Sequence, residues 1–127
     1  MEKSLPIMLH GQVHHGIKLG SRLNMPTANI IPREDITGID AGVYYSKLHI
    51  EDRIYKSITN IGRKPTVKDT PDINVETFIY DFSGDLYEKE IGVELLEFRR
   101  PEMKFGSLEE LCSHMKEDVE AGRLYRD

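Results

Sequence analysis

A glycine-bearing loop followed by a short Pro-Thr-Ala-Asn segment is the part of the sequence best suited to phosphate chemistry. The loop contains Gly16 and Gly20, and the segment at residues 26–30 contains Thr27 and Asn29. Glycines let backbone N–H groups approach an anion, and the neutral oxygens of Thr and Asn suit a hard cation such as Mg²⁺. These residues therefore predict a corner that binds phosphate and magnesium. It is not a Walker loop, because three residues separate the glycines and no Gly-Lys-Ser/Thr ending follows.

A carboxylate in the middle of a strand pattern is the candidate base. Glu76 lies within residues 74–80, where the alternation places it on one face with Phe78 and Tyr80. A carboxylate among apolar residues carries a burial cost unless it faces a polar cavity, which favours a functional site. The alternative is a solvent-exposed face of an antiparallel sheet, and the residues alone leave that alternative open.

Several strand-like segments and one helix must position these residues. Residues 42–50 and 53–61 alternate around a charged turn and form the clearest hairpin signal. Ser107 and Glu110 form a capping box ahead of apolar residues at helical spacing. The other expected strands are 7–13, 27–31, 74–80 and 91–98, and residues 62–72 are expected to form a long loop. The order predicts a mainly β fold, as a small antiparallel barrel or sandwich with a C-terminal helix.

The composition sets the class of protein. The chain has 127 residues, which favours a single domain over residues 1–127 with a real core. Its 17 basic and 22 acidic residues give a net charge of −5, which disfavours nucleic acid as a partner. Cys112 is the only cysteine, so an internal disulfide and a multi-cysteine zinc site are excluded. No apolar run approaches the roughly 20 residues of a membrane span, and no signal peptide is expected, so we predict a cytoplasmic protein without membrane contact.

Taken in order, the motifs resemble those of the riboflavin kinases (flavokinases), including the kinase half of bacterial bifunctional FAD synthetases. The matching segments are 11–13, Gly16, Gly20, 26–29, 42–44, 60–62, 65–66, 75–76, 85–87, 100–102, 104–105 and 107–109. Each segment is short, and their shared order and spacing carry the resemblance along nearly the whole chain. The resemblance implies a six-stranded antiparallel Greek-key barrel with a C-terminal α-helix.

The resemblance also implies a reaction and the residues that perform it. Family members phosphorylate the ribityl 5′-hydroxyl of riboflavin with ATP and Mg²⁺, giving FMN and ADP. By resemblance, Thr27 and Asn29 would coordinate Mg²⁺, and Glu76 would accept the proton of the attacking hydroxyl. The nucleotide would contact Gly16, Lys18, Gly20, Arg22, Thr27, Asp81 and Tyr87, and the flavin would contact Arg100, Glu102 and Phe105. The expected partners are therefore small molecules, and the protein is expected to be a monomer.

Three positions depart from the family pattern. Family members usually have glycine where this chain has Asn24 and Glu88, and bacterial members have arginine where Ser21 stands. These differences affect the expected nucleotide site more than the expected fold. The alternative function is a flavin-binding regulator or sensor that kept the barrel with little turnover. The presence of Thr27, Asn29 and Glu76 together favours the enzyme, because a sensor needs no metal pair and base.

Overall fold

The computed structural model describes residues 4–14, 25–64 and 72–126 of the chain. Its elements are β1 (Ile7–Gln12), β2 (Thr27–Ile30), β3 (Gly42–Ile50), β4 (Arg53–Lys64), β5 (Asp72–Ile79), β6 (Glu90–Pro101) and α1 (Leu108–Leu124). Every expected strand and the expected helix are present. The expected loop at 62–72 was too long at both ends, since β4 continues to Lys64 and β5 begins at Asp72.

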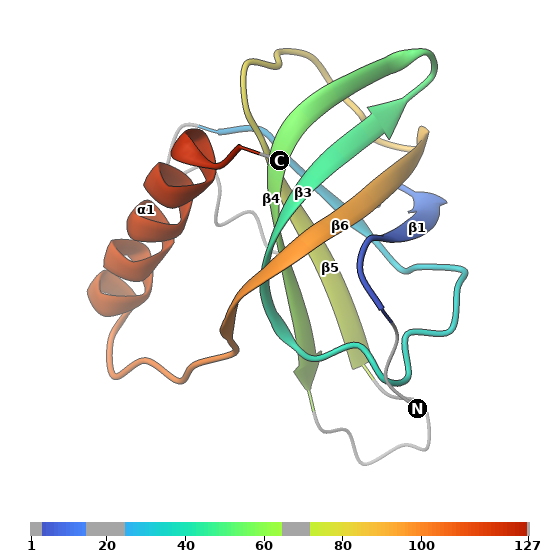
Figure 1. Ribbon diagram of the computed structural model, residues 1–127. Helices are drawn as coiled ribbons and strands as arrows, with labels where there is room; N and C mark the ends of the chain where they lie inside the picture. The colour runs from blue at the N-terminus through green and yellow to red at the C-terminus, as the bar shows by residue number, and fades with distance from the viewer. Residues whose placement is uncertain (1–3, 15–24, 65–71, 127) are drawn as a thin grey trace.

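The six strands form one antiparallel sheet in the order β1-β6-β3-β4-β5-β2 (Figure 1). Strands β3, β4 and β5 are neighbours in sequence and in space, and β6 returns to lie beside β3, which is the Greek-key order. Hydrogen bonds also join the two edges of the sheet: His14 N donates to Asn29 O and Arg33 N donates to His10 O, both at 2.9 Å. The sheet is therefore curled into a barrel-like shape, and the predicted mainly β fold with one C-terminal helix is confirmed.

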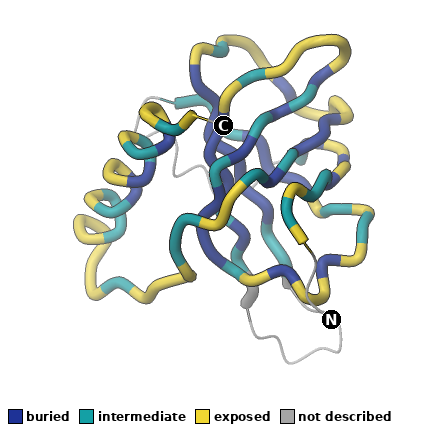
Figure 2. Tube along the Cα trace, in the orientation of Figure 1, coloured by how far each residue is buried: buried dark blue, intermediate teal, exposed yellow. Residues whose placement is uncertain are grey.

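Alternation along the strands separates two apolar clusters. On β5, Val75 and Ile79 belong to the cluster inside the curled sheet, whereas Phe78, together with Tyr80 directly after the strand, belongs to a second cluster that includes Met115 of α1. Side chains at successive strand positions point to opposite faces, which explains this division. In Figure 2 the exposed residues of α1 lie mostly on its side turned away from the sheet. The helix therefore covers the outer face of the sheet, and the candidate base Glu76 shares that face with the aromatic residues.

Polar contacts fix the helix at both ends. At its start, the Ser107 hydroxyl accepts a hydrogen bond from Glu110 N at 3.1 Å, as the capping box predicts. The Glu110 carboxylate accepts from Gly106 N at 3.2 Å instead of from Ser107 N, so the reciprocal half of the box is displaced by one residue. Toward the other end, Tyr80 OH donates to Val119 O and Lys56 Nζ donates to Arg123 O, each at 2.6 Å. Among the described residues, no helix is long and apolar enough to cross a membrane.

Gly42 is required where β3 and β6 approach each other. Its φ is +148°, and a Cβ added there would lie 2.2 Å from Arg100 O. We expect Gly42→Ala to lower the free energy of unfolding by about 2 kcal/mol through this clash. Urea unfolding measures the change. The matched control is Gly62→Ala on β4, where the nearest atom to the new Cβ is Glu102 Oε1 at 3.4 Å. Equal losses in the two variants would contradict the close approach at Gly42.

Candidate active site

A row of side chains crosses five neighbouring strands on the helix-facing side of the sheet. The register pairs Asn29 with Glu76, Glu76 with Asn60, Asn60 with Val43 and Val43 with Arg100. Directly opposed residues of antiparallel strands point to the same face, and adjacent strands lie about 4.8 Å apart. Two predicted site residues far apart in sequence, Asn29 and Glu76, are therefore neighbours. Arg100 lies at the other end of the same row.

A cavity of about 470 Å³ lies between this face of the sheet and α1. Its size falls within the range of small-molecule sites. The sheet contributes Val43, Ile58, Thr59, Asn60, Gly62, Asn74, Glu76 and Phe78 to the lining. The remaining lining comes from β6, the loop after it and α1: Arg100, Glu102, Met103, Phe105, Leu111, Met115, Asp118 and Val119. The candidate base and all three predicted flavin contacts are thus gathered around one cavity.

Glu76 is the second residue of the row, between Asn29 and Asn60, and is almost completely buried, with 3% of its surface exposed. Its Oε2 atom has no hydrogen-bond partner among the described residues. Burial raises the pKa of the Glu76 carboxyl to about 7. The alternative of a solvent-exposed sheet face is therefore wrong. A carboxyl group with this pKa can take up or release a proton near neutral pH, as a general base must.

Asn29 is opposite Glu76 and is also 3% exposed. Its Oδ1 atom likewise has no hydrogen-bond partner among the described residues. Thr27 lies two residues earlier on the same face and is half-buried. Two buried oxygens without donors are costly unless a cation or a ligand donor reaches them. The oxygen of Asn29, with the nearby Thr27 hydroxyl, therefore fits a site for a hard divalent cation such as Mg²⁺, and the oxygen of Glu76 is left for a ligand donor.

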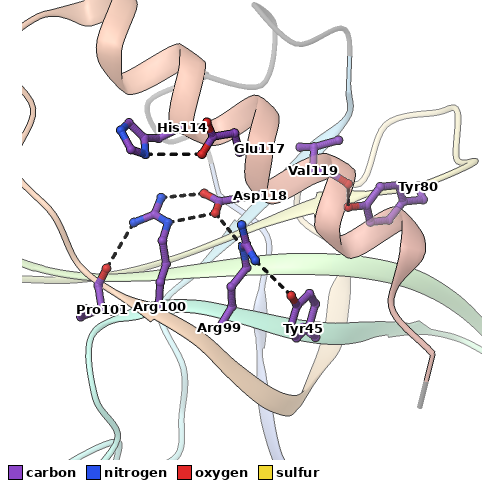
Figure 3. Close-up of polar contacts among 9 residues, drawn as sticks. All are labelled: Tyr45, Tyr80, Arg99, Arg100, Pro101, His114, Glu117, Asp118 and Val119. Atoms are coloured by element: carbon purple, nitrogen blue, oxygen red, sulfur yellow. Dashed lines mark hydrogen bonds and ion pairs between the residues drawn. The ribbon is translucent and has the colours of Figure 1, made fainter.

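At the other end of the row, Arg100 is held by a residue of the helix (Figure 3). Arg100 Nε and Nη2 donate to the two carboxylate oxygens of Asp118 at 2.9 and 2.6 Å, and Arg99 Nε donates to Asp118 Oδ1 at 2.9 Å. Arg100 Nη1 donates to Pro101 O at 3.2 Å. The Arg100 guanidinium also lies 6.0 Å from the centroid of the Phe105 ring, within the range of a cation–π contact. Arg100 therefore faces the cavity with its charge already paired to the helix.

Sequence reasoning did not find Asp118. The available signal was its position three residues after Met115 on the helix, which places a carboxylate on the apolar stripe. In the structure Asp118 is 5% exposed and accepts from two arginines. A buried carboxylate on an apolar stripe requires such partners. The residue joins α1 to β6 at the cavity wall.

Comparison with known proteins identifies the family of the chain. The family described as Flavokinase, riboflavin kinase, matches residues 3–125. The chain belongs to the riboflavin kinase family. The family expected from the motifs is thereby confirmed.

Individual relatives cover this chain almost completely. A bifunctional riboflavin kinase/FMN adenylyltransferase of Listeria monocytogenes is 32% identical over 120 residues, which cover 94% of this chain and 38% of that protein. A riboflavin kinase of Mus musculus is 31% identical over 131 residues, which cover 98% of this chain and 84% of that protein. The crystal structure of riboflavin kinase from Trypanosoma brucei matches with a TM-score of 0.60 at 26% identity, over 93% of this chain and 78% of that chain. This chain therefore spans well under half the length of the bifunctional relative.

Other residues assigned from the riboflavin kinase pattern are not part of the cavity lining. Asp81 and Tyr87 are exposed and lie in the connection between β5 and β6, so their nucleotide contacts stay predictions. The residues predicted for the phosphate loop, Gly16, Lys18, Gly20 and Arg22, lie outside the described part of the chain, as do Ser21 and Asn24.

Glu88, which stands where the riboflavin kinase pattern has glycine, adopts a backbone conformation that favours glycine. Its φ is +69°, in the left-handed region that favours glycine. Two hydrogen bonds hold this conformation: Glu88 N donates to Val13 O, and Gln12 Nε2 donates to Glu88 O, each at 2.9 Å. The Glu88 side chain is exposed. The substitution therefore leaves this turn intact.

Proposed function

We propose that residues 1–127 act as one kinase domain that transfers the γ-phosphoryl group of ATP to the ribityl 5′-hydroxyl of riboflavin. The products are FMN and ADP, and the reaction depends on Mg²⁺. The observation that carries the proposal is the buried pair of Glu76 and Asn29 beside a cavity of ligand size, in a chain of the riboflavin kinase family. A cytoplasmic monomer is part of the same proposal.

Glu76 serves as the general base. A bond forms between the ribityl 5′-oxygen and the γ-phosphorus, and the bond between that phosphorus and the oxygen bridging to the β-phosphate breaks. The hydroxyl proton passes to the Glu76 carboxylate, and ADP leaves with the electron pair of the broken bond. Phosphoryl transfer of this kind depends mainly on positioning and on charge stabilisation, and the base adds a further factor. The pKa of about 7 leaves a substantial fraction of Glu76 ionised at neutral pH.

Thr27 and Asn29 are the residues that would hold Mg²⁺ together with phosphate oxygens of the nucleotide. When bound, Mg²⁺ neutralises charge on the transferring phosphoryl group and orients it. The unpaired Oδ1 of Asn29 and its position opposite Glu76 support this assignment. Because these ligands are neutral, the proposed site gains most of its affinity for the metal from the nucleotide phosphates.

Asn29→Ala is expected to weaken binding of MgATP by about 10- to 100-fold, as loss of one good polar contact would. Affinity for riboflavin should change little, because Asn29 lies one strand beyond the cavity floor. Calorimetric titration with MgATP and fluorescence titration with riboflavin measure the two affinities. Equal losses in both titrations would indicate misfolding and would contradict a role confined to the nucleotide and metal.

The test of the proposed function is incubation of the purified protein with riboflavin, ATP and Mg²⁺, followed by chromatographic separation of FMN from riboflavin. We expect FMN in the complete mixture and none when EDTA is added. Tight binding of riboflavin without FMN would overturn the kinase proposal and favour the flavin-binding regulator.

A further inference from the structure

The row across the sheet contains one polar residue to which the family pattern assigned no role. Asn60 lies on β4, directly opposite Glu76 on one side and Val43 on the other. It is half-buried and lines the cavity. No hydrogen bond joins its side-chain amide to the other described residues. The amide carries two N–H donors and one carbonyl acceptor, so it can bind a hydroxyl group in either direction.

The row is polar at one end and becomes apolar after Asn60. Asn29, Glu76 and Asn60 are polar, and the next position is the apolar Val43. The row then ends at Arg100, whose guanidinium lies beside the Phe105 ring. A ligand that lies along this row therefore needs a polar end near Glu76 and a flat, largely apolar end near Phe105. Riboflavin has this order, with a polyhydroxylated ribityl chain attached to an aromatic ring system.

The position of Asn60 also fixes which part of the ribityl chain it meets. The reacting 5′-hydroxyl lies at Glu76 in the proposed function, on which this inference rests. Asn60 lies one strand away, about 4.8 Å, toward the apolar end of the cavity. The 4′-hydroxyl is on the carbon bonded to C5′ and is the first hydroxyl met in that direction. The other cavity-lining asparagine, Asn74, pairs with Gly62 and therefore lies off the row.

We propose that Asn60 is a specificity-determining residue that hydrogen-bonds the ribityl 4′-hydroxyl and so places the 5′-hydroxyl against Glu76. An analogue without the 4′-hydroxyl leaves the Asn60 amide unpaired in the cavity, which penalises that analogue. The same contact orients the chain, since a hydroxyl anchored next to the reacting one limits rotation of C5′.

The experiment is a cycle in which both the enzyme and the substrate are varied. Values of kcat/KM are measured for wild type and Asn60→Ala with riboflavin, 4′-deoxyriboflavin and 2′-deoxyriboflavin. We expect loss of the 4′-hydroxyl to lower kcat/KM of the wild type by about 10- to 100-fold. With riboflavin, Asn60→Ala should lower kcat/KM by a similar factor. With the 4′-deoxy analogue, kcat/KM of Asn60→Ala should be only slightly lower than that of the wild type. The 2′-deoxy change and Asn60→Ala should instead act independently, so that their separate factors multiply. Asn74→Ala is the matched control, and its effect should multiply with that of the 4′-deoxy change.

Other outcomes overturn the proposal. If Asn60→Ala lowers kcat/KM by the same factor for all three flavins, Asn60 does not contact the 4′-hydroxyl and acts through Glu76 or through the fold. A shifted pH profile of kcat would identify an effect through Glu76. Coupling to the 2′-hydroxyl instead of the 4′-hydroxyl would also overturn it. If the wild type makes no FMN, the proposed function fails. In that case the dissociation constants of the same variants and flavins, measured by flavin fluorescence, test the contact itself. If Asn60→Ala and the 4′-deoxy change weaken binding independently, the role of Asn60 is overturned.

Discussion

Glu76→Gln is expected to lower kcat for FMN formation by about 10²- to 10⁴-fold, the usual contribution of a general base. Glutamine has the shape of the glutamate side chain but cannot accept the hydroxyl proton. Riboflavin affinity should stay nearly unchanged, because Glu76 is one of many residues that line the cavity and the flavin ring is expected at its other end. Rapid-quench or steady-state assays of FMN give kcat, and quenching of flavin fluorescence gives the affinity.

The matched control for this experiment is Glu97→Gln on β6. Glu97 is exposed and is not part of the cavity lining, so its amide variant should retain turnover. In the wild type, kcat/KM for riboflavin should rise with pH through a pKa near 7, because kcat/KM reports the free protein, in which burial raises the pKa of the Glu76 carboxyl, and the ionised carboxylate is the proposed base. Turnover of Glu76→Gln close to that of the wild type would rule out Glu76 as the base.

The same substitution is expected to stabilise the folded protein at alkaline pH, by up to about 3 kcal/mol. Burial raises the pKa of the Glu76 carboxyl from 4.5 to about 7. The folded state therefore binds this proton more tightly than the unfolded state does. Stability falls as the pH rises from the unfolded pKa through the folded one, and the full cost of the buried carboxylate is present above pH 7. Glutamine carries no charge and avoids this cost.

Urea unfolding without nucleotide or metal measures the predicted gain. We expect the difference in unfolding free energy between Glu76→Gln and wild type to be below about 1 kcal/mol near pH 5 and about 3 kcal/mol near pH 8. The gain at the higher pH corresponds to an increase in Tm of roughly 10 °C for a domain of this size. Glu97→Gln should show no such pH-dependent gain. A wild type at least as stable as Glu76→Gln near pH 8 would contradict the raised pKa.

Together the two predictions assign opposite effects to one residue. The carboxylate proposed to accept the proton is buried opposite Asn29, and both side chains have oxygens without partners among the described residues. Such an arrangement is unfavourable in the free protein and becomes favourable when a cation and a substrate hydroxyl supply the missing contacts. The site is therefore prepared for its ligands at the expense of stability, which is common at functional sites.

The sequence predicted the elements of the fold because their signals are local. Alternation in residues 42–50 and 53–61 and the cap at Ser107 depend on neighbours in the chain, and the structure confirms all three. The face of Glu76 followed from its alternation with Phe78 in the same strand. A period of two residues indicates a strand and its faces, and a period of 3.6 residues indicates a helix and its faces, so these properties can be predicted from the sequence.

The contacts between distant elements could not be read from such spacing. Nothing local indicates that Asn60 lies beside Glu76, since this depends on the register between β4 and β5. Pairing of Arg100 with Asp118 depends on how α1 docks on β6, so Arg100 was assigned to the flavin without its partner. The family resemblance supplied functional roles for single residues but not the geometry that relates them.

The Greek-key order has a consequence for how activity can arise during folding. The row that forms the site takes one residue from each of five neighbouring strands, β2, β5, β4, β3 and β6. These residues span positions 29 to 100 of the chain. Pairing of segments so far apart in the chain is slow to form, because ordering the intervening residues costs entropy before any contact is made. No hairpin or shorter fragment contains more than part of the row. Catalytic competence should therefore arise only when the whole sheet has assembled, so recovery of turnover during refolding reports completion of the native topology.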